Sequence, residues 1–293
     1  MADYSIWVLE YSYVANYHVS GIVYGAHNQG YRKLPYCYVL VKGNGHAAMV
    51  DVGYNNRDYG AVMATNFGVE NWHSPRDVLA ECDVTPDEVS TVFITHAHFD
   101  HMGGIEDFPN ATFYIQEREL SKWVWAMSLD RRFRWLMLAT DPGDVLRTVD
   151  LARQGRLVCV AGDRENVLPG IDLHAAYDTH TWGSMFVSVR NDGKVGSEDT
   201  WVLAGDLVYS FENLRGPDPN DPQILPVGLA SGSQTELMLT TDRMVRLAGG
   251  DLRRVIPIHE EGLKDAFPSR VTGKGLRITE IALADGERSR VRG

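Results

Sequence analysis

Four side chains of the kinds that bind metal ions lie within six consecutive residues of this chain: His96, His98, Asp100 and His101. They follow residues 91–95, a run of β-branched and aromatic side chains that predicts a buried strand. Side chains two positions apart share a face of an extended segment, so His96 and His98 can bind one cation. Where the chain bends, Asp100 and His101 can reach a neighbouring cation. Imidazole and carboxylate groups suit zinc and similar divalent metals, so this segment predicts a metal site.

The order His-x-His-x-Asp-His at residues 96–101, after a predicted strand and before Gly103-Gly104, resembles the signature of the metallo-β-lactamase superfamily. Other parts expected of this superfamily follow in order, so the resemblance covers most of the chain. It implies an α/β fold, a four-layer αβ/βα sandwich in which two mixed sheets pack face to face with helices outside. We expect residues 1–293 to form a single domain of this kind, with the site where strand ends from both halves converge.

The resemblance also implies one more ligand for each metal group and one ligand that both share. His180, in a turn before a predicted strand, would complete the first group, and His259, after the last core strand, would complete the second. Asp206 ends the predicted strand 200–204 and would bridge two cations, because like-charged ions about 3.5–4 Å apart need an anion between them. The full predicted set is His96, His98 and His180 for one ion, Asp100, His101 and His259 for the other, and Asp206 between them.

The sequence departs from the family pattern beside two of these ligands. Related hydrolases often have Pro-Gly before the third His of the first group, whereas Asp178-Thr179 precede His180 here, so we expect a different turn. Glu260 follows His259, where the related lactonases typically have Asp. A further histidine, His174, lies inside a predicted strand and is interpreted as structural.

Tyr209 stands three residues after Asp206, and this Asp-x-x-Tyr pattern resembles the N-acyl-homoserine lactonase family. The resemblance implies that a hydroxide bridging two divalent ions, with zinc favoured, opens a lactone ring. Tyr209 would donate a hydrogen bond to the developing oxyanion, and Asp206 would carry a proton to the leaving alkoxide. Asp100 would act with them at the reacting centre. Asp51, at another strand end, would support the site by accepting a hydrogen bond from a ligand or the adjoining backbone.

The same metal core leaves other reactions open. The substrate could be a different cyclic ester, a heterocyclic lactam or amide, or a phosphotriester. Some members of the superfamily are mononuclear-iron sulfur dioxygenases, but His101 and His259 favour a second filled site and hydrolysis. A non-catalytic module held together by metal would normally close its site with four protein ligands.

Composition narrows the class of partner and the compartment. The net charge of −11 argues against nucleic acid, and so against the RNA-processing relatives, and against an anionic membrane. No apolar run approaches the length needed to span a bilayer, and the N-terminus lacks a secretory signal pattern. Three widely spaced cysteines without a C-x-x-C pattern are typical of free thiols. We therefore expect a cytoplasmic enzyme that acts on a small molecule.

Two aromatic segments are candidates for the pocket wall or for a subunit contact in a homodimer. The tyrosine-rich arm, residues 11–36, holds six tyrosines among glycines and could equally form a surface hairpin. Residues 117–139 are predicted to be one helix with tryptophans and basic residues, which favours packing by one face over a lid or dimer contact. Either segment would suit an apolar or aromatic substrate. The proline-rich loop at residues 212–232 is a further candidate for the pocket wall.

Local signals place other elements around the metal motif. Ser or Thr followed by Pro, with acidic residues after it, predicts helices over residues 75–82 and 86–90. A first strand is predicted over residues 5–8, and an edge strand over residues 278–283.

Overall fold

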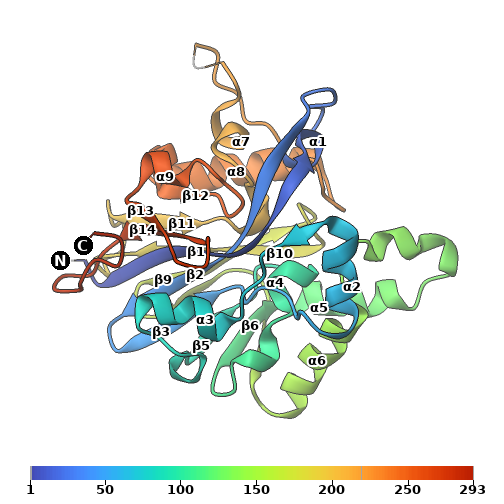
Figure 1. Ribbon diagram of the computed structural model, residues 1–293, viewed down its shortest axis with the longest axis horizontal. Coiled ribbons are helices and arrows are strands. Elements are labelled where there is room, and N and C mark those ends of the chain that lie inside the picture. Colours follow the sequence, from blue (N-terminus) through green and yellow to red (C-terminus); the bar gives the residue numbers. More distant parts are fainter. Residues whose placement is uncertain (1, 219, 293) are drawn as a thin grey trace.

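The computed structural model describes residues 2–218 and 220–292. In these residues two β-sheets pack face to face, with helices on both outer sides (Figure 1). Over the described ranges, one sheet has nine strands in the order β13-β14-β1-β2-β3-β5-β6-β7, with β4 paired to β1. The other has five, in the order β12-β11-β10-β9-β8. This arrangement confirms the predicted four-layer αβ/βα sandwich.

The first sheet consists of β1 (Tyr4–His18), β2 (Tyr31–Gly43), β3 (His46–Val50), β4 (Val69–Glu70), β5 (Thr91–Phe93), β6 (Thr112–Gln116), β7 (Leu157–Val160), β13 (Ser269–Val271) and β14 (Arg277–Ala282). The second consists of β8 (Arg164–Leu168), β9 (Ile171–Tyr177), β10 (Gly183–Arg190), β11 (Thr200–Leu203) and β12 (Val255–Ile256). The α-helices are α1 (Val19–Ile22), α2 (Asp58–Phe67), α3 (Pro75–Leu79), α4 (Phe99–Met102), α5 (Glu117–Met127), α6 (Pro142–Arg153), α7 (Phe211–Arg215), α8 (Gln234–Leu247) and α9 (Leu263–Ala266). Short 3-10 helices are η1 (Ala80–Cys82), η2 (Pro86–Glu88), η3 (Ile105–Asp107), η4 (Arg131–Met137), η5 (Gly205–Leu207) and η6 (Leu252–Arg254).

The two faces of β1 belong to different cores, because successive side chains of a strand point to opposite sides. Ile6 and Val8 pack with Val187 of the second sheet, in the core between the sheets. Trp7 and Leu9 belong to the core that includes side chains of the outer helices. Fully burying one such aliphatic side chain stabilises a fold by about 1.5–3 kcal/mol, so the sandwich is held mainly by these layers.

Two of the predicted strands have wrong boundaries or positions. The first strand continues to His18 rather than ending near residue 8, because β1 pairs with β2 along the length of the tyrosine-rich arm. The strand predicted at residues 278–283 is not at an edge, since β14 lies between β13 and β1. The predicted helices near residues 75–82 and 86–90 are present as α3 with η1 and as η2.

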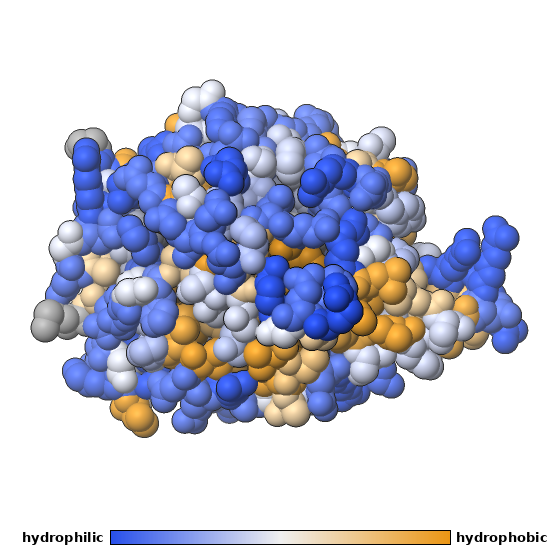
Figure 2. All heavy atoms as spheres, turned by 90° about the horizontal axis from the view of Figure 1, so that it is seen from below, coloured by the Kyte–Doolittle hydropathy of each residue, from blue (hydrophilic) through white to orange (hydrophobic). Residues whose placement is uncertain are grey.

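The single helix predicted over residues 117–139 is wrong, because α5 ends at Met127 and a separate 3-10 helix, η4, follows. The Asp130 side chain caps η4 by accepting a hydrogen bond from the backbone N–H of Arg132. This segment projects from the molecule (Figure 1, green), and Figure 2 shows hydrophobic surface on the same side. Trp123 is buried, whereas Trp135 is 67% exposed, so the aromatic residues of this segment lie in different environments.

The three cysteines are free thiols, as the sequence predicted. Cys37 and Cys82 are buried, and Cys159 is exposed. In the part of the chain that the structure describes, no helix combines the length and the apolar character that crossing a membrane requires.

The buried carboxyl of Asp144 in α6 predicts a pH-dependent stability. Burial and the charge of the neighbouring Asp141 raise the pKa of Asp144 from 3.8 to about 8. The folded protein holds the Asp144 proton more tightly than the unfolded chain does. The free energy of unfolding of the protein should therefore fall as the pH rises from the ordinary pKa of 3.8 toward about 8. Thermal unfolding of Asp144→Asn between pH 5 and 9 should therefore show a flatter pH dependence and a higher Tm at pH 9 than wild type.

The matched control is Asp150→Asn, because the Asp150 carboxyl lies on the same helix and is about half exposed. It should keep the wild-type dependence between pH 5 and 9. Identical pH profiles for Asp144→Asn and wild type would contradict the account of Asp144.

Candidate metal centre

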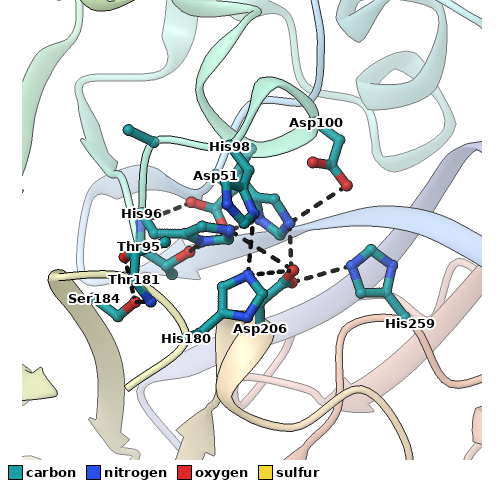
Figure 3. Close-up of polar contacts among 12 residues, drawn as sticks. Asp51, Thr95, His96, His98, Asp100, His180, Thr181, Ser184, Asp206 and His259 are labelled. Carbon is teal, nitrogen blue, oxygen red and sulfur yellow. Dashed lines mark hydrogen bonds and ion pairs between the residues drawn. The ribbon is translucent and has the colours of Figure 1, made fainter. Parts of the chain in front are cut away.

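The seven ligand side chains predicted from the sequence meet at one place, where strand ends of both sheets converge (Figure 3). The segment after β5 in the first sheet supplies four of them, at residues 96–101. His180 lies in the turn between β9 and β10, while Asp206 follows β11 and His259 follows β12. All seven side chains are buried.

The first group consists of His96, His98, His180 and Asp206, and each offers one atom within 4.8 Å of the others. His98 Nδ1 lies 3.0 Å from His180 Nε2. Asp206 Oδ2 lies 3.3 Å from His180 Nε2 and 3.7 Å from His96 Nε2. These four atoms therefore surround a common point.

The second group consists of Asp100, His101 and His259, whose candidate ligand atoms also lie within 4.8 Å of one another. Asp206 Oδ1 is 2.9 Å from His101 Nε2 and 3.0 Å from His259 Nε2. Asp100 Oδ2 is 3.6 Å from the same His101 nitrogen. Asp206 thus turns one oxygen to each group, which is the arrangement that a shared ligand requires.

The donor atoms of the centre fit divalent cations. Among the described residues, His96 Nε2 and His101 Nε2 are buried and have no partner with acceptable hydrogen-bond geometry. Leaving a buried polar group unpaired costs about 1–3 kcal/mol, so such groups are rare without a ligand. Burial also lowers the pKa of His96 and His98 well below the usual value, so both rings are neutral and carry a free lone pair. One cation beside His96 Nε2 and another beside His101 Nε2, each also bound by Asp206, would satisfy both nitrogens.

Asp206 carries the negative charge that such cations need. Burial opposes ionisation of its carboxyl group, but the neighbouring charges of His101 and His259 outweigh this effect. The pKa of Asp206 is therefore held well below its usual range. The carboxylate stays ionised at neutral pH.

Asp51 orients two of the ligand rings, consistent with the supporting role expected of it. Its Oδ2 accepts hydrogen bonds from His101 Nδ1 and from the Thr95 hydroxyl, both at 2.8 Å. The same hydroxyl lies 3.0 Å from His96 Nδ1. Because Nδ1 of each ring is engaged in this way, Nε2 faces the centre. Asp51 adopts a left-handed backbone with φ of +63°, a conformation that Asp tolerates better than most residues.

The remaining ligand segments are positioned by local contacts. His259 Nδ1 donates a 2.7 Å hydrogen bond to the carbonyl of Pro35 in β2. Gly205 has φ of +54°, and a Cβ there would come within 2.9 Å of the Thr95 side chain, so the backbone before Asp206 can approach the segment that follows β5. His259 and Asp206 are thereby held to the first sheet, although their own strands belong to the second.

The turn before His180 is built on Asp178, the first residue of the Asp178-Thr179 pair that departs from the family pattern. Asp178 has φ of +53°, and its backbone N–H donates to the carbonyl of Trp182 at 3.2 Å. Arg118 of α5 also pairs with the Asp178 carboxylate at 2.6 Å. The other histidine considered from the sequence, His174, lies outside the centre with Nε2 2.8 Å from the Ser188 hydroxyl, in line with its structural interpretation.

A cavity of about 20 Å³ adjoins the candidate metal-ligand side chains, and several residues of its wall come from the two aromatic segments. The tyrosine-rich arm contributes Tyr17, while Tyr24 and Tyr31 of the same arm are exposed. Leu229 from the proline-rich loop covers the site as well, and its N–H donates to the Gly21 carbonyl at 3.2 Å. Leu34 and Ala139 come from the two aromatic segments, residues 11–36 and 117–139, whereas the walls that sequence reasoning did not assign come from α2 and α4, namely Phe67 and Phe99. Nothing in the sequence of α2 had indicated that this helix would line the cavity.

Tyr209 lies on the cavity wall beside the second group. Its ring centroid is 4.7 Å from that of His259 and 5.9 Å from that of His180. Burial, followed by the charge of Asp206, raises the pKa of the Tyr209 phenol well above its usual value. The phenol is therefore protonated at neutral pH and can donate a hydrogen bond.

Comparison with known proteins gives the family. The model of the metallo-beta-lactamase superfamily matches residues 31–257, and the chain belongs to this superfamily. The N-acyl homoserine lactonase AiiB of Rhizobium rhizogenes (strain K84 / ATCC BAA-868) is 25% identical over 140 residues. That match covers 47% of this chain and 48% of the relative, so the chain spans about half the length of the curated relative it matches.

Solved structures share the fold over nearly the whole chain. A quorum-quenching N-acyl homoserine lactone lactonase is 18% identical with a TM-score of 0.64, and the alignment covers 91% of this chain and 96% of that one. The hydrolase AbOPH of the beta lactamase superfamily is 17% identical with a TM-score of 0.63, covering 97% and 96%. At this level of identity the likeness establishes the fold.

The role of Asp51 gives a test of the centre. Asp51→Asn replaces a charged acceptor of the His101 and Thr95 protons by a neutral amide, so the ligand rings should be less well oriented. Zinc affinity, measured by competition with a chromophoric chelator, should fall about 10–100-fold. The control is Asp83→Asn, which has a similar left-handed backbone with φ of +52° and is not one of the centre's residues. Equal zinc affinity in both variants would remove Asp51 from the account.

Proposed function

We propose that this protein is a dinuclear-metal hydrolase that opens a lactone ring, in the manner of the N-acyl-homoserine lactonases it resembles. The observation that carries the proposal is the position of Asp206, with one oxygen toward each His-rich group and the Tyr209 phenol nearby. The predicted ligands support two ions, and His and carboxylate donors favour zinc. A complete second group argues against the mononuclear-iron alternative.

The residues of the centre divide the chemistry between them. Two bound divalent cations would lower the pKa of water at the site toward about 7 and polarise the substrate carbonyl. Tyr209 donates a hydrogen bond to the carbonyl oxygen as it gains negative charge. The Asp206 carboxylate accepts the proton released by the attacking water and returns it to the alkoxide that leaves when the ring C–O bond breaks. Asp100 would bind the cation of the second group and add a negative charge beside it.

The cavity walls favour a neutral substrate with an apolar substituent. Tyr17 and Tyr36 of the tyrosine-rich arm, together with Phe67 and Leu229, present mostly apolar surface to the ligands. Such walls exclude water from the reacting carbonyl and strengthen the hydrogen bond from Tyr209. This apolar lining favours an uncharged lactone with an acyl or aryl group over an anionic substrate. Because about 20 Å³ holds roughly one water molecule, the walls must move apart for such a substrate to enter.

A panel of substrates tests the reaction class. Zinc-loaded protein would be assayed with acyl-homoserine lactones, aromatic lactones, lactams and phosphotriesters, and hydrolysis of each would be followed by chromatography of substrate and product. We expect the highest kcat/KM for a lactone. A higher value for a lactam or a phosphotriester would replace lactone hydrolysis by the corresponding activity on the same centre.

Removing a ligand should abolish most turnover without unfolding the chain. His98→Ala and Asp206→Ala should each lower kcat/KM by about 10²–10⁴-fold, because each variant loses a group that organises charge at the reacting centre. His174→Ala is the matched control, since His174 lies outside both groups. Near wild-type rates for either ligand variant, with circular dichroism showing an unchanged fold, would contradict the two-group mechanism.

Tyr209→Phe separates the hydroxyl of that residue from its ring. If the phenol stabilises the oxyanion, kcat should fall about 10²–10³-fold while KM changes little. Tyr38→Phe is the control, because the Tyr38 hydroxyl is buried without a hydrogen-bond partner in the described structure and does not line the cavity. An unchanged kcat for Tyr209→Phe would restrict this residue to packing.

A further inference from the structure

We propose that Glu119 is the positioning residue for the first metal group, a role that rests on the proposed metal centre. Glu119 lies in the first turn of α5 and is fully buried, at 0% exposure. It is not one of the ligand candidates. Its carboxylate instead joins the two chain segments that carry the imidazoles of that group.

Each of the two carboxylate oxygens of Glu119 accepts two hydrogen bonds. Oε1 accepts from the backbone N–H of Ala97 at 2.8 Å and from the indole N–H of Trp123 at 2.7 Å. Oε2 accepts from the Thr181 hydroxyl at 2.7 Å and from the backbone N–H of Gly183 at 2.8 Å. Charge-assisted hydrogen bonds of this kind are shorter and stronger than neutral ones, so the four donors are held firmly.

These donors come from the ligand segments themselves. Ala97 stands between His96 and His98, and Thr181 directly follows His180. One carboxylate therefore ties the segment with two imidazoles of the first group to the turn with the third. The two segments belong to different sheets, so Glu119 fixes a distance that neither sheet fixes alone.

The indole held by Glu119 also restrains a ligand ring. Trp123 lies edge-on to His98, with ring centroids 6.0 Å apart. Its other neighbour is Trp182, two residues after His180, with ring centroids 4.7 Å apart. The packing around Trp123 thus repeats the link between the two segments through apolar contact.

The backbone shows how closely these parts are joined. A Cβ on Gly183 would come within 2.2 Å of the backbone nitrogen of Glu119, so the start of β10 packs directly on the start of α5. The second metal group has supports of its own, namely Asp51 for His101 and the Pro35 carbonyl for His259, although Asp51 also reaches His96 through Thr95. The hydrogen bonds to Glu119 flank ligands of the first group, so we expect Glu119 to act mainly on that group.

Glutamine tests this role with almost no change of volume. Its side chain offers one acceptor oxygen and one NH₂ donor, so it can satisfy only one of the two donor pairs fully. Glu119→Gln therefore removes acceptor capacity rather than packing. It should loosen the link between the two ligand segments while the side chain at position 119 stays buried.

The experiment measures zinc affinity in two single-group backgrounds, by competition with a chromophoric chelator. Asp100→Ala with His259→Ala leaves the first group intact, and His98→Ala with His180→Ala leaves the second, because each pair reduces the other group to two donors. Adding Glu119→Gln should lower zinc affinity about 10–100-fold in the first background and by less than about twofold in the second. A residue that only stabilised the fold would affect both backgrounds alike.

Glu280→Gln is the matched control, since Glu280 is also buried and lies within reach of an indole N–H, that of Trp7, and of a backbone N–H. It should leave both affinities unchanged. Thr181→Val, which removes one donor to Glu119, provides a second variant should Glu119→Gln not fold. It should produce a smaller loss in the same background only.

Three results would overturn the role of Glu119. The first is a folded Glu119→Gln protein with unchanged zinc affinity in both backgrounds, and the second is an equal loss in both. The third applies if Glu119→Gln does not fold: an unchanged zinc affinity in Thr181→Val would then overturn the role of Glu119. Wild-type protein that binds two zinc ions would leave the proposed function standing in these cases. Wild-type protein that binds no zinc would overturn the proposed function together with the role of Glu119.

Discussion

The Asp206 carboxylate, buried among imidazoles from both sheets, is the interaction on which the rest of the site depends. Gathering this many ionisable groups out of water is unfavourable unless opposite charge compensates them. Cations on both sides of Asp206 would supply that compensation, because one of its oxygens faces each group. The sandwich provides the rigid strand ends that hold the groups at this separation.

Orientation of the ligand rings comes from several supports around Asp206, of which Asp51 serves both groups, because it also reaches His96 through Thr95. Asp51 and the Pro35 carbonyl fix the outer nitrogens of His101 and His259. Glu119 acts through the backbone, since it accepts hydrogen bonds from the N–H groups of Ala97 and Gly183 near the ligands of the first group. The cavity then adds a third layer, in which the tyrosine-rich arm and the proline-rich loop cover the centre with apolar side chains. Rigidity and exclusion of water are both needed for charge stabilisation during catalysis.

The sequence predicted the parts of the protein whose signals are local. The cluster at residues 96–101 holds four ligand side chains in one strand-to-helix turn, and the fold followed from the resemblance that it carries. His180, Asp206 and His259 needed that resemblance, because no spacing links residues so far apart in the chain. Glu119 was missed since a glutamate in a helix rich in charged residues predicts a solvated position, and only tertiary packing buries it. The break after Met127 was missed because no glycine or proline marks it, and the short β13 had no clear pattern.

Anomalous diffraction at the zinc edge, from crystals grown with zinc, tests the central claim most directly. Two peaks should flank the Asp206 carboxylate. One should lie among His96, His98 and His180, and the other among Asp100, His101 and His259. A single peak, or peaks away from Asp206, would contradict a centre in which this carboxylate is shared by two ions.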